Sequence, residues 1–344
     1  MTASPEVEAR VAEVRARLRD LRALLERRGD AAALLTTRRN VAWLTAGAAA
    51  HVLESAETAI AGLLVTRDDM IAITQNIEAA RLADEEFAGL DVEVAAVPWW
   101  EPGAIEAEAG RRLTAGKQPA RDDALEADLV AIRSVLSPFD RERLAVLGRT
   151  AARAVDSALE AIRPGMSEEE LAADLSSRLP GVRAPVVLVA ADERIARYRH
   201  PLPGTTPIRS RVMLVLVAER FGLHVALTRI RELERPAAEL ARRIEDVAAV
   251  QAAMHEATRP GTTFADVFDV ARRAYADAGF PDEWRDHHQG GSIGYQARER
   301  IAVPGDETVV QPGMAFAWNP SIAGAKAEDT IVVHDDQLEV LTGT

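Results

Sequence analysis

Apolar residues recur every three to four positions along the first part of the chain. They stand at Val7, Val11, Val14, Leu18, Leu21 and Leu25. Because this spacing gathers them on one face of a helix, the pattern predicts a helix over residues 5–28, which Gly29 ends. Shorter apolar runs at 31–35, 59–65 and 70–73 predict strands, so the N-terminal part is expected to fold as an α/β unit.

Two further helical patterns, at 77–87 and 105–113, complete this unit. The polar stretch 115–123 that follows is predicted to be a loop. We place the domain boundary shortly after this loop. The expected organisation is an N-terminal domain of residues 1–135 and a C-terminal domain of residues 136–344.

The C-terminal part repeats one arrangement of helices. A helical pattern over 141–162 ends at Pro164-Gly165, and a second pattern over 239–257 ends at Pro260-Gly261, 96 residues further on. Each Pro-Gly pair is followed by hydroxyl residues that can cap the next helix. The sequence therefore predicts two helix pairs in corresponding places.

Strand-like runs follow each helix pair. They lie at 186–191 and 212–218 after the first pair, and at 315–318 and 330–333 after the second. This correspondence indicates an internal duplication, with two similar α+β halves related by a pseudo-twofold axis. A binding site in such a domain is expected between the halves.

Charge and composition narrow the classes of function. The 344 residues carry a formal net charge of -13, which repels nucleic acid and anionic lipid, so we expect neither as a partner. The absence of cysteine excludes disulfides, a thiol nucleophile and thiolate metal sites. No apolar run approaches the ~20 residues of a membrane span, and the N-terminus is charged, so we expect a soluble cytoplasmic protein.

One segment, residues 286–299, concentrates groups that can carry chemistry. It holds the adjacent His287 and His288, three glycines and Arg298, in a chain with only 7 histidines. Close approach of the backbone at Gly290-Gly291 would suit a ligand cleft. A glycine-rich turn with solvated histidines would give the same pattern, so the segment alone leaves both interpretations open.

A series of short motifs extends in a fixed order over most of residues 138–344. They are Arg199-His200-Pro201, Gly222-Leu223, Thr228-Arg229, the segment from His287 to Glu299, Pro312-Gly313-Met314, Asn319-Pro320 and Ala327-Glu328-Asp329-Thr330. In this order they resemble the pita-bread family of aminopeptidase P, prolidase, methionine aminopeptidase and creatinase. The resemblance implies an α+β fold, with a pita-bread domain after a smaller α/β domain of the creatinase type.

The metal-dependent members that the chain resembles hold two divalent ions with two Asp, one His and two Glu. Such a set of donors bridges the ions and lowers the pKa of a shared water. The resemblance places the five positions at Val215, Ala226, Gly291, Asn319 and Glu328. Because only Glu328 keeps a ligand group, neither a dinuclear metal site nor any other cofactor is expected.

The same resemblance suggests which residues are catalytic. His200 matches an acid/base position of creatinase, and an ordinary histidine pKa of about 6.5 suits proton transfer near neutrality. The alternative for His200 is a loop histidine bonded to a carbonyl group. His287 matches a cleft histidine of aminopeptidase P, while His288 has no counterpart but can reach the same place. With Glu328, these histidines form the predicted catalytic group.

Five residues are predicted to bind substrate. They are Arg298, Asn319, Thr228, Tyr295 and Arg39. Arg298 stands where the metal enzymes have a second histidine, and it can hold a carboxylate or an oxyanion, or else pair with Glu299 or Glu328. The alternative for Tyr295 is core packing. Arg39 belongs to the domain that, in creatinase-type oligomers, reaches the neighbouring subunit's cleft, so the resemblance also implies a homodimer.

Three hypotheses of function follow. The first is a metal-independent hydrolase of a C–N bond, of amide, peptide or amidine type, in a small polar substrate or short peptide. The second is a non-catalytic pseudopeptidase that binds a small ligand or peptide, because most of the metal ligands are missing. The third is an aminopeptidase with a relocated metal site made by His287, His288 and Glu328.

Overall fold

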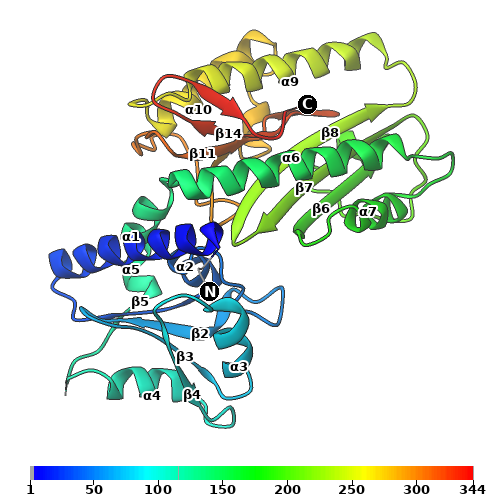
Figure 1. Cartoon of the computed structure of the whole chain (residues 1–344). Helices are drawn as coiled ribbons and strands as arrows, with labels where there is room; N and C mark the ends of the chain where they lie inside the picture. The colour runs from blue at the N-terminus through cyan, green and yellow to red at the C-terminus, as the bar shows by residue number, and fades with distance from the viewer. Residues whose placement is uncertain (1–3, 115, 344) are drawn as a thin grey trace. The chain divides into compact units, whose positions relative to one another are not determined.

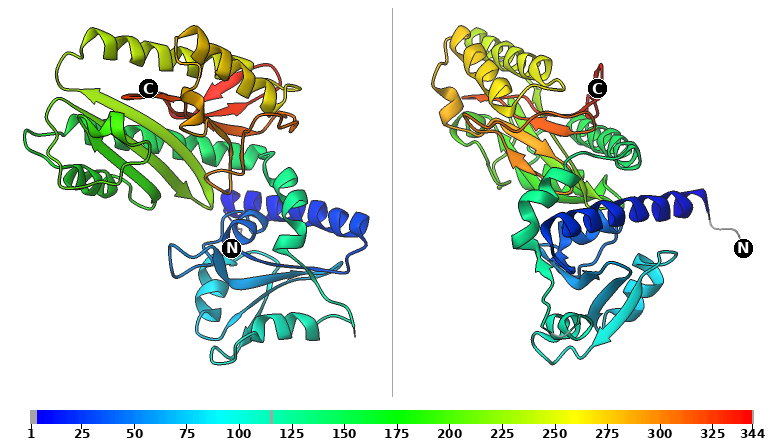
Figure 2. Two further views of the ribbon diagram at one scale, coloured as in Figure 1. Left: turned by 180° about the vertical axis from the view of Figure 1, so that it is seen from behind. Right: turned by 90° about the vertical axis from the view of Figure 1, so that its left-hand side faces the viewer.

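The computed structural model describes residues 4–114 and 116–343. These residues form two compact units, Met1–Arg133 and Ser134–Thr344. Each unit has its own sheet or sheets with helices packed against them, as Figures 1 and 2 show from three sides. Among the described residues, no helix combines the length and the apolar character needed to cross a membrane.

The N-terminal unit contains one mixed sheet and the helices around it. Its elements are α1 (Pro5–Arg28), β1 (Ala33–Thr37), α2 (Arg38–Leu44), β2 (Thr58–Val65), β3 (Met70–Gln75), α3 (Ala79–Arg81) with the π-helical turn η1 (Leu82–Glu86), β4 (Glu93–Val97), α4 (Ala104–Arg111), β5 (Ala120–Arg121) and α5 (Asp122–Arg133). The strand order is β4-β3-β2-β1-β5. The predicted first helix is confirmed from end to end, with Gly29 in the left-handed conformation (φ 77°) at its C-terminus.

The predicted loop over 115–123 is partly wrong. β5 pairs in parallel with β1 through Ala33 and Ala120, and α5 begins directly at Asp122. The carboxylate of Asp122 accepts hydrogen bonds from Thr36, Thr37 and Asn40. A two-residue strand and a helix that begins with two acidic residues depend on these distant partners, so the local pattern does not reveal them.

The C-terminal unit contains the repeated part of the chain. Its elements are α6 (Pro138–Glu160), α7 (Glu168–Ser177), β6 (Arg183–Ala191), α8 (Arg194–Arg197), β7 (Arg211–Arg220), β8 (Leu223–Glu232), α9 (Ala238–Ala257), α10 (Phe264–Asp277), the 3-10 helix η2 (Glu283–Arg285), β9 (Gly290–Ile293), β10 (Arg300–Ile301), β11 (Ala315–Trp318), β12 (Ser321–Ile322), β13 (Ala325–Lys326), β14 (Asp329–Val333) and β15 (Leu338–Val340).

A helix pair followed by an antiparallel sheet occurs twice in this unit, as the sequence predicts. α6 and α7 precede the sheet β6-β7-β8, and α9 and α10 precede the sheet β10-β9-β11-β14-β15. Capping boxes begin α7 and α10, at Ser167 with Glu170 and at Thr263 with Asp266. The two halves therefore repeat in their element order and in how their second helices start.

β8 is one of the strands that the hydrophobic pattern does not predict. Phe221 and Gly222 both have positive φ angles, 57° and 78°, and make the two-residue turn of a tight hairpin between β7 and β8. β8 then meets the second half, because the backbone of Thr228 forms a bridge with Glu328 just before β14. This junction brings residues about 100 positions apart into contact.

Candidate functional site

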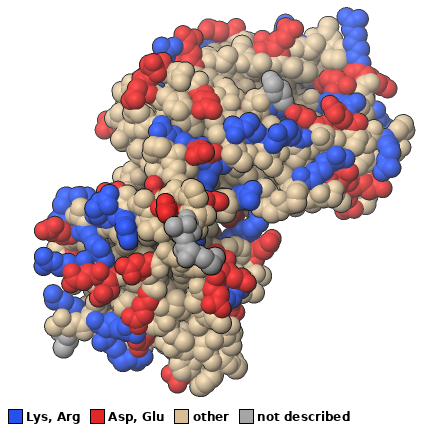
Figure 3. All heavy atoms as spheres, in the orientation of Figure 1, with Lys and Arg blue, Asp and Glu red and all other residues tan. Residues whose placement is uncertain are grey.

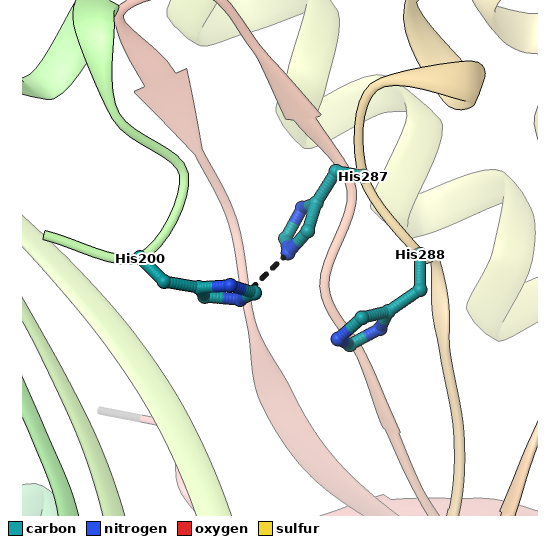
Figure 4. Close-up of side chains that lie close together, drawn as sticks. All are labelled: His200, His287 and His288. Carbon is teal, nitrogen blue, oxygen red and sulfur yellow. Dashed lines mark hydrogen bonds between the residues drawn. The ribbon is translucent and has the colours of Figure 1, made fainter.

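Three histidines from two loops point toward one another in the C-terminal unit (Figure 4). His200 follows α8, and His287 and His288 precede β9. The Nε2 atoms of His200 and His287 lie 3.2 Å apart. The ring centroid of His288 is 5.8 Å from that of His200 and 4.8 Å from that of His287. We call these three residues the histidine trio; the structure brings both adjacent histidines, and not just one of them, next to His200.

A polar network holds His287 in place. Its Nδ1 lies 3.0 Å from the hydroxyl of Ser321, which also accepts a hydrogen bond from Arg199. Arg199 in turn forms an ion pair with Glu283, at 2.6 Å. The carbonyl of His287 accepts from the side-chain amide of Gln289. Both ring nitrogens of His287 are therefore engaged, one by Ser321 and the other by His200.

Burial and neighbouring cations keep the trio neutral at neutral pH. Burial lowers the pKa of His287 to about 2 and that of His288 to about 4, and the positive charge of Lys326 adds to the first shift and those of Arg298 and Lys326 to the second. The pKa of His200 is also lowered, by burial and then by Lys326. The Nδ1 of His288 accepts from the Gly290 amide, so the hydrogen of the neutral ring stands on Nε2.

Beside the trio lies the carboxylate of Glu328, which is buried and fully engaged. Its Oε1 accepts from Arg298 at 2.9 Å, and its Oε2 accepts from Thr228 at 2.8 Å and from Lys326 at 3.1 Å. Burial alone would raise the pKa of Glu328, but Lys326 and Arg298 lower it to about 2. Glu328 is therefore a permanent anion with two cations against it, and the predicted pairing of Arg298 with Glu328 is the one observed.

Lys326 is a site residue that the sequence reasoning missed. Its side chain is only 5% exposed, and its ammonium group faces Glu328. It is one of two lysines in the whole chain, the other being Lys117. A lysine between alanines, two residues before the surviving acid, in a chain whose other basic residues are almost all arginine, is the signal that would have found it.

The dinuclear metal centre that the resemblance implies does not fit this site. Val215 is the cross-strand partner of Thr228, and Ala226 precedes Thr228 by two residues, so all three side chains share one face of the sheet. On that face, Thr228 contacts Glu328, and the two positions that need aspartates present aliphatic groups instead. No step of chemistry through a pair of metal ions can be derived from these residues.

Gly291, at the position of the histidine ligand, has no room for a side chain. A Cβ atom built there would lie 2.0 Å from the carbonyl oxygen of Arg300, and one built at Gly290 would lie 2.1 Å from that of Ala317. These glycines therefore let β9 lie close to β10 and β11. The close backbone approach that the structure shows at these glycines is to neighbouring strands, and their approach to a ligand stays a prediction.

Among the described residues, the group that could hold a single metal ion is the histidine trio itself. One ligand atom from each of the three rings lies within 4.8 Å of the others. The relocated metal site predicted from the sequence consists of His287, His288 and Glu328. The structure instead brings His287 and His288 together with His200. The ammonium of Lys326 and the guanidinium of Arg298 near the trio oppose a divalent cation there.

Of the remaining predicted site residues, Asn319 lies beside the segment that carries two histidines of the trio, since its backbone N–H donates to the carbonyl of Gln289, whereas Tyr295 and Arg39 have partners elsewhere. Asn319 is buried, and its Oδ1 has no hydrogen-bond partner within residues 4–114 and 116–343. The hydroxyl of Tyr295 donates to Asp140 at the start of α6, which is a contact within the core. Arg39 belongs to the N-terminal unit, where it pairs with Glu126.

A small cavity opens beside His287 and Lys326. Its walls are mainly apolar and include Ile195, Met213 and Ile322. Met213 and Val215 are two residues apart on β7, so their side chains lie on the same face of the sheet. The cavity therefore lies on the face that carries Val215 and Ala226, the positions of the two aspartate ligands in the metal-dependent relatives. The site thus combines three histidines that can transfer protons, the carboxylate of Glu328 paired with two cations, and a small apolar cavity.

Known families and proteins resemble part of the chain in sequence. The model of metallopeptidase family M24 matches residues 142–335. The probable dipeptidase PepE of Mycobacterium tuberculosis is 29% identical over 188 residues, which are 52% of this chain and 50% of that protein. The chain therefore spans about half the length of the curated relative that it matches.

Solved structures resemble the chain along nearly all of its length. The prolidase of Pyrococcus horikoshii has a TM-score of 0.79 at 20% identity, over 96% of this chain and 98% of that one. The Xaa-Pro dipeptidase of Bacillus anthracis has a TM-score of 0.77 at 20% identity, over 96% and 98%. These likenesses confirm the predicted pita-bread fold.

Proposed function

Since the chain belongs to metallopeptidase family M24 but lacks that family's paired metal ligands, we propose that it is a metal-independent hydrolase of C–N bonds. Its substrate is a small polar molecule or short peptide with an amide or peptide bond. The observation that carries the proposal is the convergence of the histidine trio beside an ionised carboxylate and two cations. Relatives named as dipeptidases support the class of bond.

His200 is the proposed general base. It is the most exposed of the trio, and its lowered pKa leaves the ring unprotonated at neutral pH. It takes a proton from a water molecule as the water oxygen forms a bond to the carbonyl carbon. The same proton then passes to the leaving nitrogen as the C–N bond breaks, so the step balances without an added reactant.

Lys326 and Arg298 supply the positive charge that this reaction needs. In the transition state the carbonyl oxygen gains negative charge, and fixed cations in a partly buried site stabilise it. Glu328 keeps both cations in place through the contacts at 3.1 Å and 2.9 Å. His287 acts as a positioning residue, because its Nε2 fixes the ring of His200 and its Nδ1 is held by Ser321.

Metal analysis and turnover test the proposal together. The metal content of the purified protein is measured, and amine release from Xaa-Pro dipeptides and amino-acid amides is followed before and after chelation. We expect turnover that chelators do not affect. Stoichiometric metal with turnover that a chelator abolishes would contradict metal independence and would point to an ion held by the histidine trio.

A non-catalytic binding protein is the second candidate. It is favoured by the complete engagement of Glu328, whose two oxygens already accept from three side chains. Such a carboxylate has little capacity left to orient a water molecule. Failure of the whole substrate panel, together with measurable binding of the same compounds, would favour this candidate over the hydrolase.

We also propose that the protein is a homodimer through its N-terminal unit. Five large apolar side chains there are 56–66% exposed: Val52, Leu53, Ile77, Trp99 and Trp100. They belong to the segments before β2, after β3 and after β4. Because β2 is antiparallel to β3 and β4 is parallel to it, these segments meet at one end of the sheet. An apolar group of this kind on a surface is typical of an interface.

A further inference from the structure

We propose that Lys326 and Arg298 form a subsite for the carboxylate group of a small ligand, next to the histidine trio. The inference rests on the proposed function only for calling that ligand a substrate, since binding requires no turnover. It assigns a recognition role to a lysine that stands outside every motif of the sequence.

The charge balance of the pocket is positive. Glu328 is the one carboxylate among the groups that act on the pKa values of the trio, whereas Lys326 and Arg298 both act as cations on them. With neutral histidines, two positive charges face one negative charge. A carboxylate on the ligand would add a second negative charge, so that two cations would face two anions.

Donors remain available for such an anion. The ammonium of Lys326 has three hydrogens and makes one contact with Glu328. The Nε of Arg298 is buried and has no partner within the described residues. The Nε2 of His288 carries a hydrogen, because its Nδ1 accepts from the Gly290 amide. These are groups that donate, and a carboxylate only accepts.

The shape of the site suits a small ligand. His200 is exposed and the Arg298 side chain is 17% exposed, so a ligand can approach these two residues from solvent. Lys326 also lines the small apolar cavity with Met213 and Ile322. This cavity has a volume of about 10 Å³, the room of a single water-sized group, so the apolar part of a ligand that reaches it is no larger than a methyl group.

A matched pair of probes tests the subsite: N-acetyl-L-alanine and its neutral amide, N-acetyl-L-alaninamide. Binding to the full chain is measured by calorimetry. We expect the carboxylate to bind about tenfold more tightly than the amide, because its hydrogen bonds are charge-assisted. Lys326→Gln and Arg298→Gln should each remove most of this preference.

Two controls isolate the pocket from general charge effects. Lys117→Gln alters the only other lysine, and Arg259→Gln alters an exposed arginine with 66% side-chain exposure. Both should keep the wild-type preference. If Lys326→Gln does not fold, Arg298→Gln carries the same test on the more exposed cation. Lys326→Arg, which keeps the charge, should retain part of the preference.

Three results would overturn the inference. They are equal or absent binding of the two probes by the wild type, a preference that survives in both pocket variants, and tight binding of zinc that His287→Gln abolishes. The outcomes also separate this inference from the hydrolase. Binding without any turnover leaves the subsite standing, whereas equal turnover of neutral and carboxylate-bearing amides with no probe preference leaves only the hydrolase.

Discussion

At the scale of single residues, a buried histidine can act as a neutral base, because burial disfavours its protonated form. The trio shows why, since each ring is desolvated and faces Lys326 or Arg298. Protonating any of the rings would add positive charge to a pocket that already has an excess. The same cations that disfavour imidazolium favour an oxyanion, so one set of charges serves both the base and the transition state.

Replacing His200 should therefore abolish turnover without unfolding the protein. We expect His200→Ala to lower kcat by a factor of about 10² to 10⁴, the usual contribution of a general base. His334→Ala changes an exposed-loop histidine bonded to Glu339 and should leave kcat unchanged. Steady-state kinetics on the best substrate of the panel compares the two, and equal activity of His200→Ala and the wild type would rule out the base.

The pH dependence of kcat/KM gives a second readout of His200. Its pKa is lowered from 6.5 by burial and then by Lys326, so the base form persists below pH 6.5. The acid limb of the wild-type profile should have its midpoint below 6.5, and Lys326→Gln should shift this midpoint upward. A midpoint that stays fixed in Lys326→Gln would mean that another group controls the limb.

Stability should also respond to pH through His287. Its pKa is about 2 in the folded protein and near 6.5 in the unfolded chain, so between these values only the unfolded state takes up the proton. The free energy of unfolding should fall as the pH drops below 6.5, by about 1.4 kcal/mol per pH unit for each such group. His287→Asn should flatten this slope in urea unfolding between pH 6.5 and pH 4. Equal slopes would show that the folded protein already protonates His287.

Single residues were predictable where position alone decides the chemistry. The loss of metal ligands at Val215, Ala226 and Asn319 follows from their places in the motif series, because aliphatic and amide side chains do not replace the missing carboxylates. Lys326 was not predictable in the same way, because its importance comes from burial against Glu328. Sequence alone does not show whether a lysine is solvated or desolvated.

At the scale of elements, the strands that pack closely against β9 occupy the space that the histidine ligand of the metal-dependent relatives would need. Gly290 and Gly291 allow the backbones of β10 and β11 to approach, and the histidines just before β9 take their direction from this strand. The longer helices α1, α6, α7, α9 and α10 were predictable, because their spacing is local, whereas α5 was not. β5 and β8 were not, since each is defined by pairing with residues far away in the chain or by a two-residue turn.

Adding one methyl group at Gly290 should test this packing. Gly290→Ala should lower the free energy of unfolding by more than about 2 kcal/mol, because its Cβ would meet the Ala317 carbonyl at 2.1 Å and its φ is 95°. Gly110→Ala, in α4 with no atom within 4 Å, should be neutral or stabilising. Urea unfolding of both variants gives the comparison, and a harmless Gly290→Ala would contradict the close approach of β9 and β11.

At the scale of the whole molecule, charge is spread over both units (Figure 3), while the large apolar side chains exposed on the N-terminal unit gather at one end of its sheet. Acidic and basic side chains are interspersed on the face of each unit seen in Figure 3. The five exposed apolar residues of the N-terminal unit instead share one end of its sheet. An interface between two copies of a chain with net charge -13 needs such a gathering, because the burial of apolar surface has to outweigh the repulsion between like charges.

Removing the two tryptophans should change the oligomeric state. We expect the wild type to have the mass of a dimer in light scattering and the double variant Trp99→Ser, Trp100→Ser to have the mass of a monomer. Val146→Ser replaces an exposed apolar residue of α6 in the other unit and should leave the mass unchanged. A wild type that is monomeric at high concentration would contradict the proposed dimer.

Because the chain has so few lysines, chemical labelling of their amines can report on the opening of the site. Lys117 is exposed and Lys326 is buried, and the chain has no other lysine. An amine-acylating reagent will modify Lys117 at once and Lys326 much more slowly, because only 5% of the Lys326 side chain is exposed and its ammonium group is paired with Glu328 unless the site opens further. The ratio of labelling at the two positions, read by mass spectrometry, therefore follows the opening of the site in the native protein with no introduced probe.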